Sequence, residues 1–191
     1  LAMSAQGEAV LAVDKNGTAL TNSPVTFDAR TAGLPAWWLE RKSRMELAQI
    51  SGMPLHGMYS LNKILWFKQN QPDVFAKAHR FHCYEDFVQL RLGLDHIMSN
   101  SLAARTMALD ARKGDWSQEL LDIAGVPCEK LPRTAQSGTV VGTISDTVAD
   151  EIGLPRDVVV STGGHDQPAG ALGAGILESG EAVYATGTVD C

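Results

Sequence analysis

The segment Gly163-Gly164-His165-Asp166-Gln167-Pro168 carries one carboxylate at a position where it could do chemistry. It follows an apolar strand over residues 158–162 and precedes an Ala/Gly-rich stretch that predicts a helix. A carboxylate between a strand end and a helix N-terminus lies at the rim of an α/β sheet, where ligands commonly bind. Two compatible roles are therefore open for Asp166. It could cap a helix that begins near Gln167, or it could act as a general base that the helix dipole keeps ionised.

The elements that position this carboxylate follow from the spacing of apolar residues. Residues 1–27 predict short strands with turns at Lys15-Asn16-Gly17 and Asn22-Ser23-Pro24. Residues 34–125 predict helices. From residue 139 onward, strands alternate with helices, which is typical of an α/β layer. These strands are expected over residues 139–144, 158–162 and 182–186.

Two details of the helical region are also predicted. We expect an apolar set of residues to form the buried face of a single helix, the first of the region. We expect a later helix to have Asp115 as its N-cap and Gly125 as its C′ residue. The apolar set consists of Trp37, Trp38, Leu39, Met45 and Ala48.

Composition and charge exclude several classes of function. The 191 residues carry a formal net charge of −6, whereas a nucleic-acid-binding protein would show a basic stripe. No run approaches the roughly 18 apolar residues of a membrane span, and no basic n-region of a signal peptide precedes Lys15. Three widely spaced cysteines, Cys83, Cys128 and Cys191, indicate reduced thiols in a cytoplasm. The segment His79-Arg80-Phe81-His82-Cys83 lacks a second ligand pair, so we expect no metal there.

An ordered set of motifs runs through the whole chain. Residues 163–175 are followed by Gly180 and Ala185-Thr186-Gly187-Thr188, and this segment is similar to the signature of the FGGY family of carbohydrate kinases. Each motif is weak by itself, and the order of the whole set is specific. The upstream motifs are Ser4-Ala5-Gln6-Gly7-Glu8, Val13-Asp14-Lys15-Asn16-Gly17, Phe27-Asp28-Ala29-Arg30-Thr31, residues 59–66 with Asn70 and Pro72, Glu85-Asp86, residues 101–106, residues 116–121, Gly125-Val126-Pro127 and Leu131-Pro132.

The resemblance implies a fold and an activity. The fold would be an α/β, actin-like (ribonuclease H-like) ATPase domain with a helical insertion, without its first strands and with the start of a second, similar domain. Residues 1–178 would form the N-terminal, sugar-binding domain and residues 179–191 the beginning of the C-terminal, nucleotide-binding domain. Such a xylulokinase-like or glycerol kinase-like enzyme phosphorylates a hydroxyl of a ketose, polyol or glycerol-like substrate in the cytoplasm, with ATP and Mg²⁺. The chain resembles an internal fragment, which we expect to be inactive alone; a homodimer is left open.

The resemblance also implies roles for single residues. Asp166 matches the general base of the family, and Gln167 matches a neighbouring amide that holds substrate hydroxyls. Gln6 and Glu8 lie in the loop that contacts the polyol in glycerol kinases, and Tyr59 matches a tyrosine that contacts glycerol there. Glu8 could instead be a solvated acid at a strand end, and Tyr59 an amphipathic residue at a helix start.

Further matches concern a charged pair and the nucleotide. Asp28 and Arg30 match a recurring pair of the family, although a surface ion pair would look the same in sequence. Gly187 and Thr188 belong to a segment similar to a phosphate-binding hairpin, although a Thr-Gly-Thr turn is an ordinary hairpin in most proteins.

The sequence departs from the family at two places in the sugar site. Gly7 stands where glycerol kinases have an arginine, and Thr26 stands where the family often has a tryptophan. The substrate face should therefore be smaller or more polar than a stacking site. A rival interpretation is a catalytically silent, actin-like sugar-binding or regulatory protein. A chaperone-like actin relative is disfavoured by the helical insertion and by Gly164-His165-Asp166-Gln167.

Overall fold

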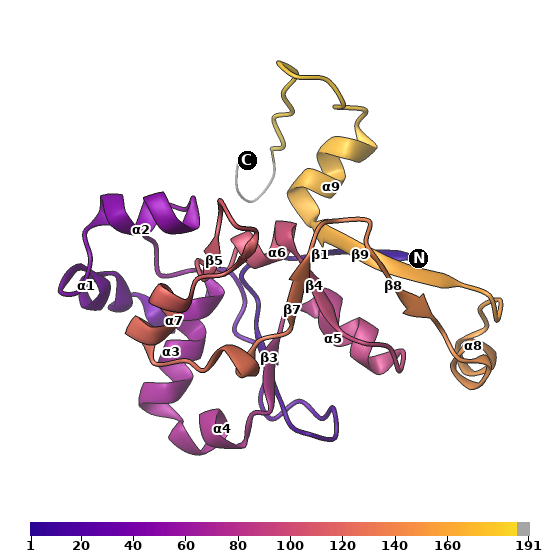
Figure 1. Cartoon of the computed structure of the whole chain (residues 1–191), viewed down its shortest axis with the longest axis horizontal. Helices are drawn as coiled ribbons and strands as arrows, with labels where there is room; N and C mark the ends of the chain where they lie inside the picture. The colour runs from indigo at the N-terminus through magenta and orange to yellow at the C-terminus, as the bar shows by residue number, and fades with distance from the viewer. Residues whose placement is uncertain (187–191) are drawn as a thin grey trace.

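The computed structural model describes residues 1–186 and contains a three-stranded sheet in the order β1, β9, β8. β1 (Ala2–Ala5) runs parallel to β9 (Val159–His165), and β8 (Val140–Thr143) runs antiparallel to β9. Figure 1 shows β9 crossing the right-hand part of the molecule, from α8 (Asp146–Ile152) at its start to α9 (Asp166–Gly173) at its end. The α/β layer predicted from residue 139 onward is therefore confirmed, and β9 continues three residues beyond the predicted strand end.

A glycine is required where β1 and β9 pair. A Cβ atom built on Gly163 would lie 2.0 Å from the carbonyl oxygen of Met3, which is closer than any side chain can approach. The peptide N–H of Gly163 also donates to the buried Glu85 carboxylate, which accepts a second bond from Ser99 N at 3.0 Å. Burial raises the pKa of Glu85. The end of β9 is thus fastened to the body of the domain just before Asp166.

The helices and the remaining strands form the body of the molecule on the left and at the centre of Figure 1. The helices are α1 (Leu34–Leu39), α2 (Arg44–Ser51), α3 (Ser60–Asn70), α4 (Pro72–Lys77), α5 (Tyr84–Arg91), α6 (Asn100–Ala104) and α7 (Gln118–Ala124), with 3-10 turns at η1 (Ala29–Thr31) and η2 (Cys128–Lys130). The strands pair as β2 (Leu11–Val13) with β3 (Arg80–His82), β4 (Ile97–Ser99) with β7 (Arg133–Ala135), and β5 (Leu109–Asp110) with β6 (Asp115–Trp116).

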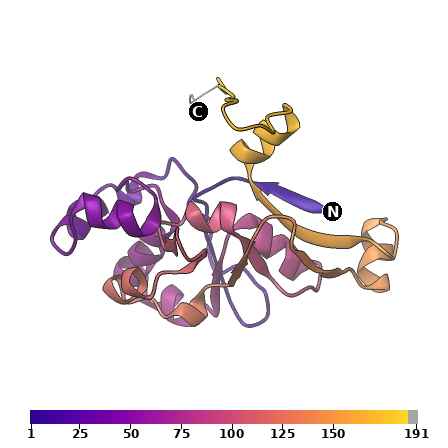
Figure 2. The ribbon, with the colours of Figure 1, turned by 45° about the horizontal axis from the view of Figure 1, so that its top comes forward.

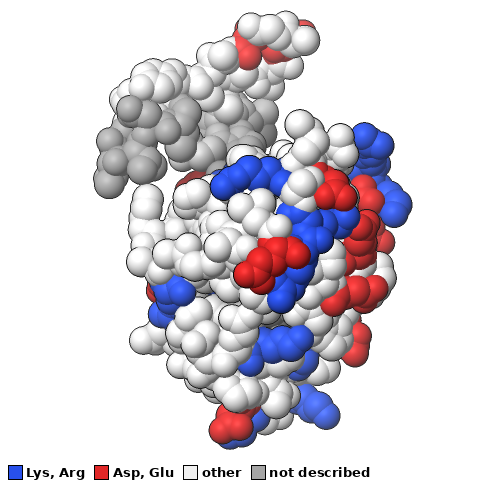
Figure 3. All heavy atoms as spheres, turned by 90° about the vertical axis from the view of Figure 1, so that its left-hand side faces the viewer, with Lys and Arg blue, Asp and Glu red and all other residues white. Residues whose placement is uncertain are grey.

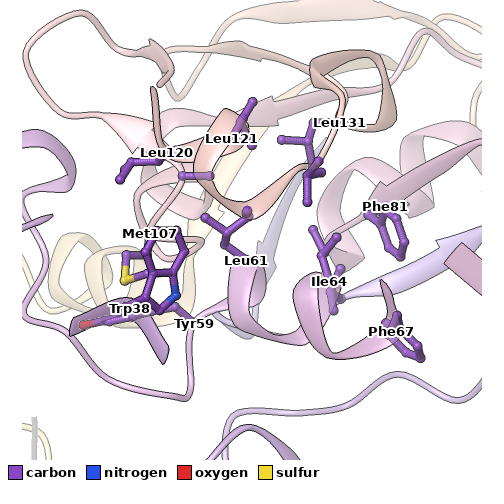
Figure 4. Packing of buried hydrophobic residues seen from close by; sticks show 14 of the residues in the cluster. Trp38, Tyr59, Leu61, Ile64, Phe67, Phe81, Met107, Leu120, Leu121 and Leu131 are labelled. Atoms are coloured by element: carbon purple, nitrogen blue, oxygen red, sulfur yellow. The ribbon is translucent and has the colours of Figure 1, made fainter. Parts of the chain in front are cut away.

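The main hydrophobic core surrounds α3, which is buried along most of its length. Figure 4 shows side chains from α1, α3, α7 and β3 packing around it. The indole N–H of Trp38 donates to Asn62 Oδ1 at 2.6 Å, so these two buried polar groups satisfy each other. The labelled members are Trp38, Tyr59, Leu61, Ile64, Phe67, Phe81, Met107, Leu120, Leu121 and Leu131.

The prediction that residues 37–48 belong to a single helix is wrong. The chain forms two helices instead, and α2 begins with a capping box in which Ser43 and Glu46 satisfy each other's backbone N–H groups. Trp38 is fully buried as predicted, whereas Leu39 is 42% and Met45 67% exposed. The break at the cap rotates these two side chains out of the helix face that covers the core.

The predicted cap of the later helix is half correct. Gly125 ends α7 with a left-handed φ of 60°, as predicted. Ser117, not Asp115, is the N-cap, since its Oγ accepts from Leu120 N at 3.3 Å while Asp115 pairs within β6. Serine is as good an N-cap residue as aspartate, and Ser117 lies directly before the first residue of α7.

Several predicted boundaries of strands and helices are also wrong. The region 34–125 contains β3, β4, β5 and β6, whose two or three residues are too short to produce an alternating pattern. Residues 182–186 form no strand, because no other described segment pairs with them. The turn at Lys15-Asn16-Gly17 is confirmed: Asp14 Oδ1 accepts from Asn16 N at 2.8 Å and Thr18 N at 2.9 Å, and Gly17 has a φ of 78°.

The surface carries charges of both signs. On the face shown in Figure 3, basic and acidic side chains are interspersed. Among the surface ion pairs, Lys42 contacts Glu46 at 3.6 Å and Glu119 at 2.7 Å. Among the residues described, no helix combines the length and the hydropathy that a membrane crossing requires.

Candidate functional site

Asp166 is the first residue of α9, directly after the end of β9. The predicted helix start near Gln167 is confirmed to within one residue, whereas the predicted cap is wrong, because His165 and not Asp166 is the N-cap. The Asp166 side chain is 47% exposed, and its Oδ1 lies 3.1 Å from His165 Nε2. A carboxylate in the first turn of a helix is stabilised by the N-terminal end of the helix dipole. Gln167 follows in the same turn and is exposed.

The loop Gln6-Gly7-Glu8 lies at the same edge of the sheet as Asp166. Because β1 and β9 are parallel, their C-terminal ends coincide, and Ala5 is paired with His165. Figure 2 shows α9 rising from the point where β1 and β9 end side by side. The structure therefore brings together two segments that the sequence separates by about 160 residues.

Glu8 is buried, with an exposed fraction of 2%, and both of its carboxylate oxygens are engaged. Oε1 forms an ion pair with Arg105, whose Nε lies 2.5 Å away, and Oε2 lies 3.0 Å from Thr26 Oγ1. Thr26 Oγ1 also accepts from Gln6 Nε2 at 3.0 Å. The alternative interpretation of Glu8 as a solvated acid is therefore wrong. The Arg105 side chain is 25% exposed, so Arg105 is the member of this pair that reaches the surface.

Tyr59 belongs to the core and to this cluster at once. It is the residue before α3, its exposed fraction is 1%, and burial raises the pKa of its hydroxyl. The Arg105 guanidinium lies 5.4 Å from the centroid of the Tyr59 ring, which is cation–π distance. Tyr59 thus supports Arg105 from the side of the core.

Lys63 binds the backbone of Glu8. Its Nζ donates to the Glu8 carbonyl oxygen at 2.7 Å, and the Lys63 side chain is fully buried in α3. Glu8 has a left-handed φ of 62°, which costs a non-glycine residue about 1–2 kcal/mol. Burial lowers the pKa of Lys63 from its ordinary value of 10.5 to about 8, against an opposing effect of Glu8.

The lowered pKa of Lys63 predicts a pH dependence of stability. Between pH 8 and 10.5 the unfolded chain keeps the Lys63 proton that the folded chain has lost, so the free energy of unfolding should rise with pH across this window. The shift corresponds to about 3 kcal/mol. Denaturant titrations should show this rise for the natural chain and its loss in Lys63→Met. The exposed Lys77→Met is the control, and an unchanged slope in Lys63→Met would contradict the prediction.

Asp28 and Arg30 form a separate pair close to Thr26. Asp28 Oδ1 accepts from Arg30 Nε at 2.8 Å and from Arg30 N at 3.0 Å, and Arg30 holds the pKa of Asp28 below its ordinary value. The Arg30 guanidinium also lies 4.6 Å from the centroid of the Trp66 ring. Thr26 and Asp28 both line an open cavity of about 610 Å³, and His56 and Met58 line it as well. No described contact links this pair to Asp166.

The predicted site residues are therefore placed unequally. Thr26 and Arg105 link Gln6, Glu8 and Tyr59 into one cluster. His165 lies beside Gly7 of the same loop and beside Asp166. Gln167 is exposed on α9, and the Asp28–Arg30 pair has no described contact with Asp166. Gly187 and Thr188 lie outside the described residues. Sequence reasoning missed Arg105, Lys63 and His165 as members of the site. Arg105 lies within the quoted motif 101–106, and it is the basic residue of that motif.

The described residues do not assemble a metal site. Nowhere between residues 1 and 186 do three His, Cys, Asp or Glu side chains come together around one point. Asp166 and its histidine neighbour form only a pair.

The comparisons with known proteins agree on one family. Residues 1–173 match the model of the "FGGY family of carbohydrate kinases, N-terminal domain". The chain is 30% identical over 146 residues to L-fuculokinase of Escherichia coli (strain K12), covering 76% of this chain and 31% of that protein. It is 30% identical over 189 residues to xylulose kinase of Bacillus subtilis (strain 168), covering 98% and 38%.

Solved structures show the same relationship. A gluconate kinase from Lactobacillus acidophilus superposes with a TM-score of 0.78 at 28% identity, over 85% of this chain and 33% of that one. A ligand-bound xylulose kinase from the same organism superposes with a TM-score of 0.82 at 27% identity, over 90% and 35%.

These matches settle the fold and the family. The predicted actin-like fold is confirmed. The chain spans about a third of the length of these relatives, and its predicted division after residue 178 stays a prediction. With a family model that matches residues 1–173, the chain belongs to the FGGY family of carbohydrate kinases.

Proposed function

We propose that the protein to which this chain belongs transfers a phosphoryl group from ATP to a hydroxyl of a sugar or polyol, with Asp166 as the general base. The observation that carries the proposal is the position of Asp166. Its half-exposed carboxylate stands in the first turn of α9, at the edge where β1 and β9 end and beside a cluster of polar side chains. Family membership supports the same reaction.

The chemistry requires a base at this place. A sugar hydroxyl is a weak nucleophile, so a carboxylate within hydrogen-bond reach must accept its proton while the bond to the γ-phosphorus forms. The N-terminal end of the helix dipole stabilises negative charge at the position of Asp166. Gln167, in the same turn, offers an amide that can both donate to and accept from hydroxyl groups.

We assign the orientation of the sugar to the Glu8–Arg105 pair together with Gln6 and Tyr59. Glu8 is too deeply buried to meet a sugar by itself, whereas the Arg105 guanidinium reaches the surface. Glu8 and the Tyr59 ring would therefore fix Arg105, and Arg105 would donate to oxygen atoms of the substrate. The Asp28–Arg30 pair, across Thr26, would border the far end of a longer substrate.

The nucleotide is proposed to bind through residues beyond those described. ATP supplies the phosphoryl group, and Mg²⁺ would neutralise charge on the phosphates. The resemblance assigns phosphate contacts to Gly187 and Thr188, and the described residues hold no metal site. We also propose a cytoplasmic location, which is supported by the free thiols of Cys83 and Cys128. The homodimer stays a prediction.

A substrate panel tests the proposed function. The full-length gene product, with ATP and Mg²⁺, should release ADP in the presence of at least one compound from a panel. The panel includes xylulose, fuculose and gluconate, which the names of the relatives indicate, and glycerol, which the family resemblance suggests. A coupled assay of ADP release measures this turnover. Sugar binding by calorimetry without any ADP release would favour the catalytically silent sugar-binding protein. If no sugar binds and no sugar causes ADP release, both interpretations are refuted.

A further inference from the structure

The side chain of His165 fills the space next to the Cα atom of Gly7. A Cβ atom built on Gly7 would lie 2.7 Å from both Cδ2 and Nε2 of His165, and 3.3 Å from Cγ of Arg105. The register of β1 and β9, which pairs Ala5 with His165, sets this approach. The imidazole of His165 therefore lies where a side chain at position 7 would otherwise stand.

The ring of His165 is held firmly in this place. The backbone N–H of His165 donates to Ser101 Oγ at 3.0 Å, and the side chain is 13% exposed. Its Nε2 lies 3.1 Å from Asp166 Oδ1. Burial lowers the pKa of His165, with Arg105 acting in the same direction and Asp166 and Glu8 opposing it. A neutral ring that is protonated at Nε2 can donate a hydrogen bond to the Asp166 carboxylate.

We propose that His165 is a positioning residue for Asp166 and that the missing side chain at position 7 is what allows it to act. The Nε2–H group of His165 engages Oδ1 of Asp166, which leaves Oδ2 to accept the proton of the sugar hydroxyl. The inference rests on the proposed function, in which Asp166 is the general base. Because Gly7 has no side chain, it leaves room for the His165 ring that orients the Asp166 carboxylate.

Two substitutions of His165 separate the hydrogen bond from simple packing. Phenylalanine fills the same space without a donor, whereas the amide of glutamine reaches as far as Nε2 and donates. We expect His165→Phe to lower kcat by about 10- to 100-fold, the worth of a hydrogen bond to a charged group. His165→Gln should keep most of the wild-type kcat. KM for the sugar should change little in either variant. Equal kcat values in wild type, His165→Phe and His165→Gln would overturn the positioning role.

A double-mutant cycle tests the Gly7–His165 contact without relying on activity. Gly7→Ala should lower the free energy of unfolding in the wild-type background and cost much less in the His165→Ala background, because the clash with the ring is then gone. Gly33→Ala, where an added Cβ meets nothing within 4 Å, is the control for a glycine replacement. Equal costs of Gly7→Ala in both backgrounds would overturn the shared-space inference.

The outcomes distinguish the inference from the function on which it rests. If the cycle shows coupling and His165→Phe keeps the wild-type kcat, the contact exists and the positioning role is wrong. If instead Asp166→Asn keeps the wild-type kcat, the proposed base is wrong. Coupling in the cycle, a slow His165→Phe and an active His165→Gln together would establish the inference.

Discussion

Asp166→Asn in the full-length gene product should lower kcat by about 10²- to 10⁴-fold, the usual contribution of a general base. The amide keeps the shape of the side chain and its place in the first turn of α9, but it cannot accept the proton of a hydroxyl. Sugar affinity should change far less, because binding rests on the polar cluster around Arg105. Steady-state kinetics with the best substrate, together with calorimetric titration of the sugar, measures both quantities.

The stability of the Asn variant is the control for this experiment. Asp166 is not the N-cap of α9, and its side chain is half exposed, so thermal unfolding should be nearly unchanged. Asp122→Asn, on the exposed side of α7, is a matched carboxylate replacement away from the site. A variant that kept wild-type turnover and lost thermal stability would show that Asp166 supports the helix and not the chemistry.

The Glu8–Arg105 pair should show the second large effect. Removing one partner of a buried ion pair costs about 3–5 kcal/mol of unfolding free energy. We expect a loss of this size for Arg105→Met, which strands the buried carboxylate of Glu8. Glu8→Ala should cost less, because the Arg105 guanidinium is 25% exposed and keeps part of its hydration. Denaturant titration measures both losses, and the exposed Arg41→Met is the control.

The same two variants should lose selectivity for the sugar. A site that hydrogen-bonds a substrate hydroxyl rejects the analogue without it by about 10⁴- to 10⁵-fold, since its own polar groups are left unpaired. When either partner is removed, deoxy analogues of the true substrate should be rejected much less strongly at the hydroxyl that Arg105 contacts. Values of kcat/KM for parent and deoxy sugars test this expectation. An equal decrease for parent and deoxy sugars would mean that the pair supports the fold and does not contact the substrate.

Local patterns in the sequence were sufficient for the elements that local contacts decide. The turn at Lys15-Asn16-Gly17 depends on Asp14 and on a glycine within a few residues, and the end of α7 depends on Gly125. The junction of an apolar strand, two glycines and a carboxylate likewise placed Asp166 at a sheet edge from a single segment. The ordered motifs were sufficient to identify the family, because each is short and its position in the order is specific.

Competition between neighbouring residues was harder to predict. Ser43 begins a new helix within an apolar pattern that looked continuous, and Ser117 takes the cap that Asp115 was expected to provide. Strands of two or three residues leave no periodic signal, so β3 to β6 were hidden inside a region that predicted only helices.

The composition of the site was decided by the tertiary structure alone. Arg105 meets Glu8 across 97 residues of sequence, and Lys63 meets it across 55. The parallel pairing of β1 with β9 places Gly7 against His165. Hydrophobic spacing and local motifs report which elements form, because they depend on neighbours within a few residues. Which loops come together at a sheet edge depends on strand pairing and core packing between distant segments, which no local pattern contains.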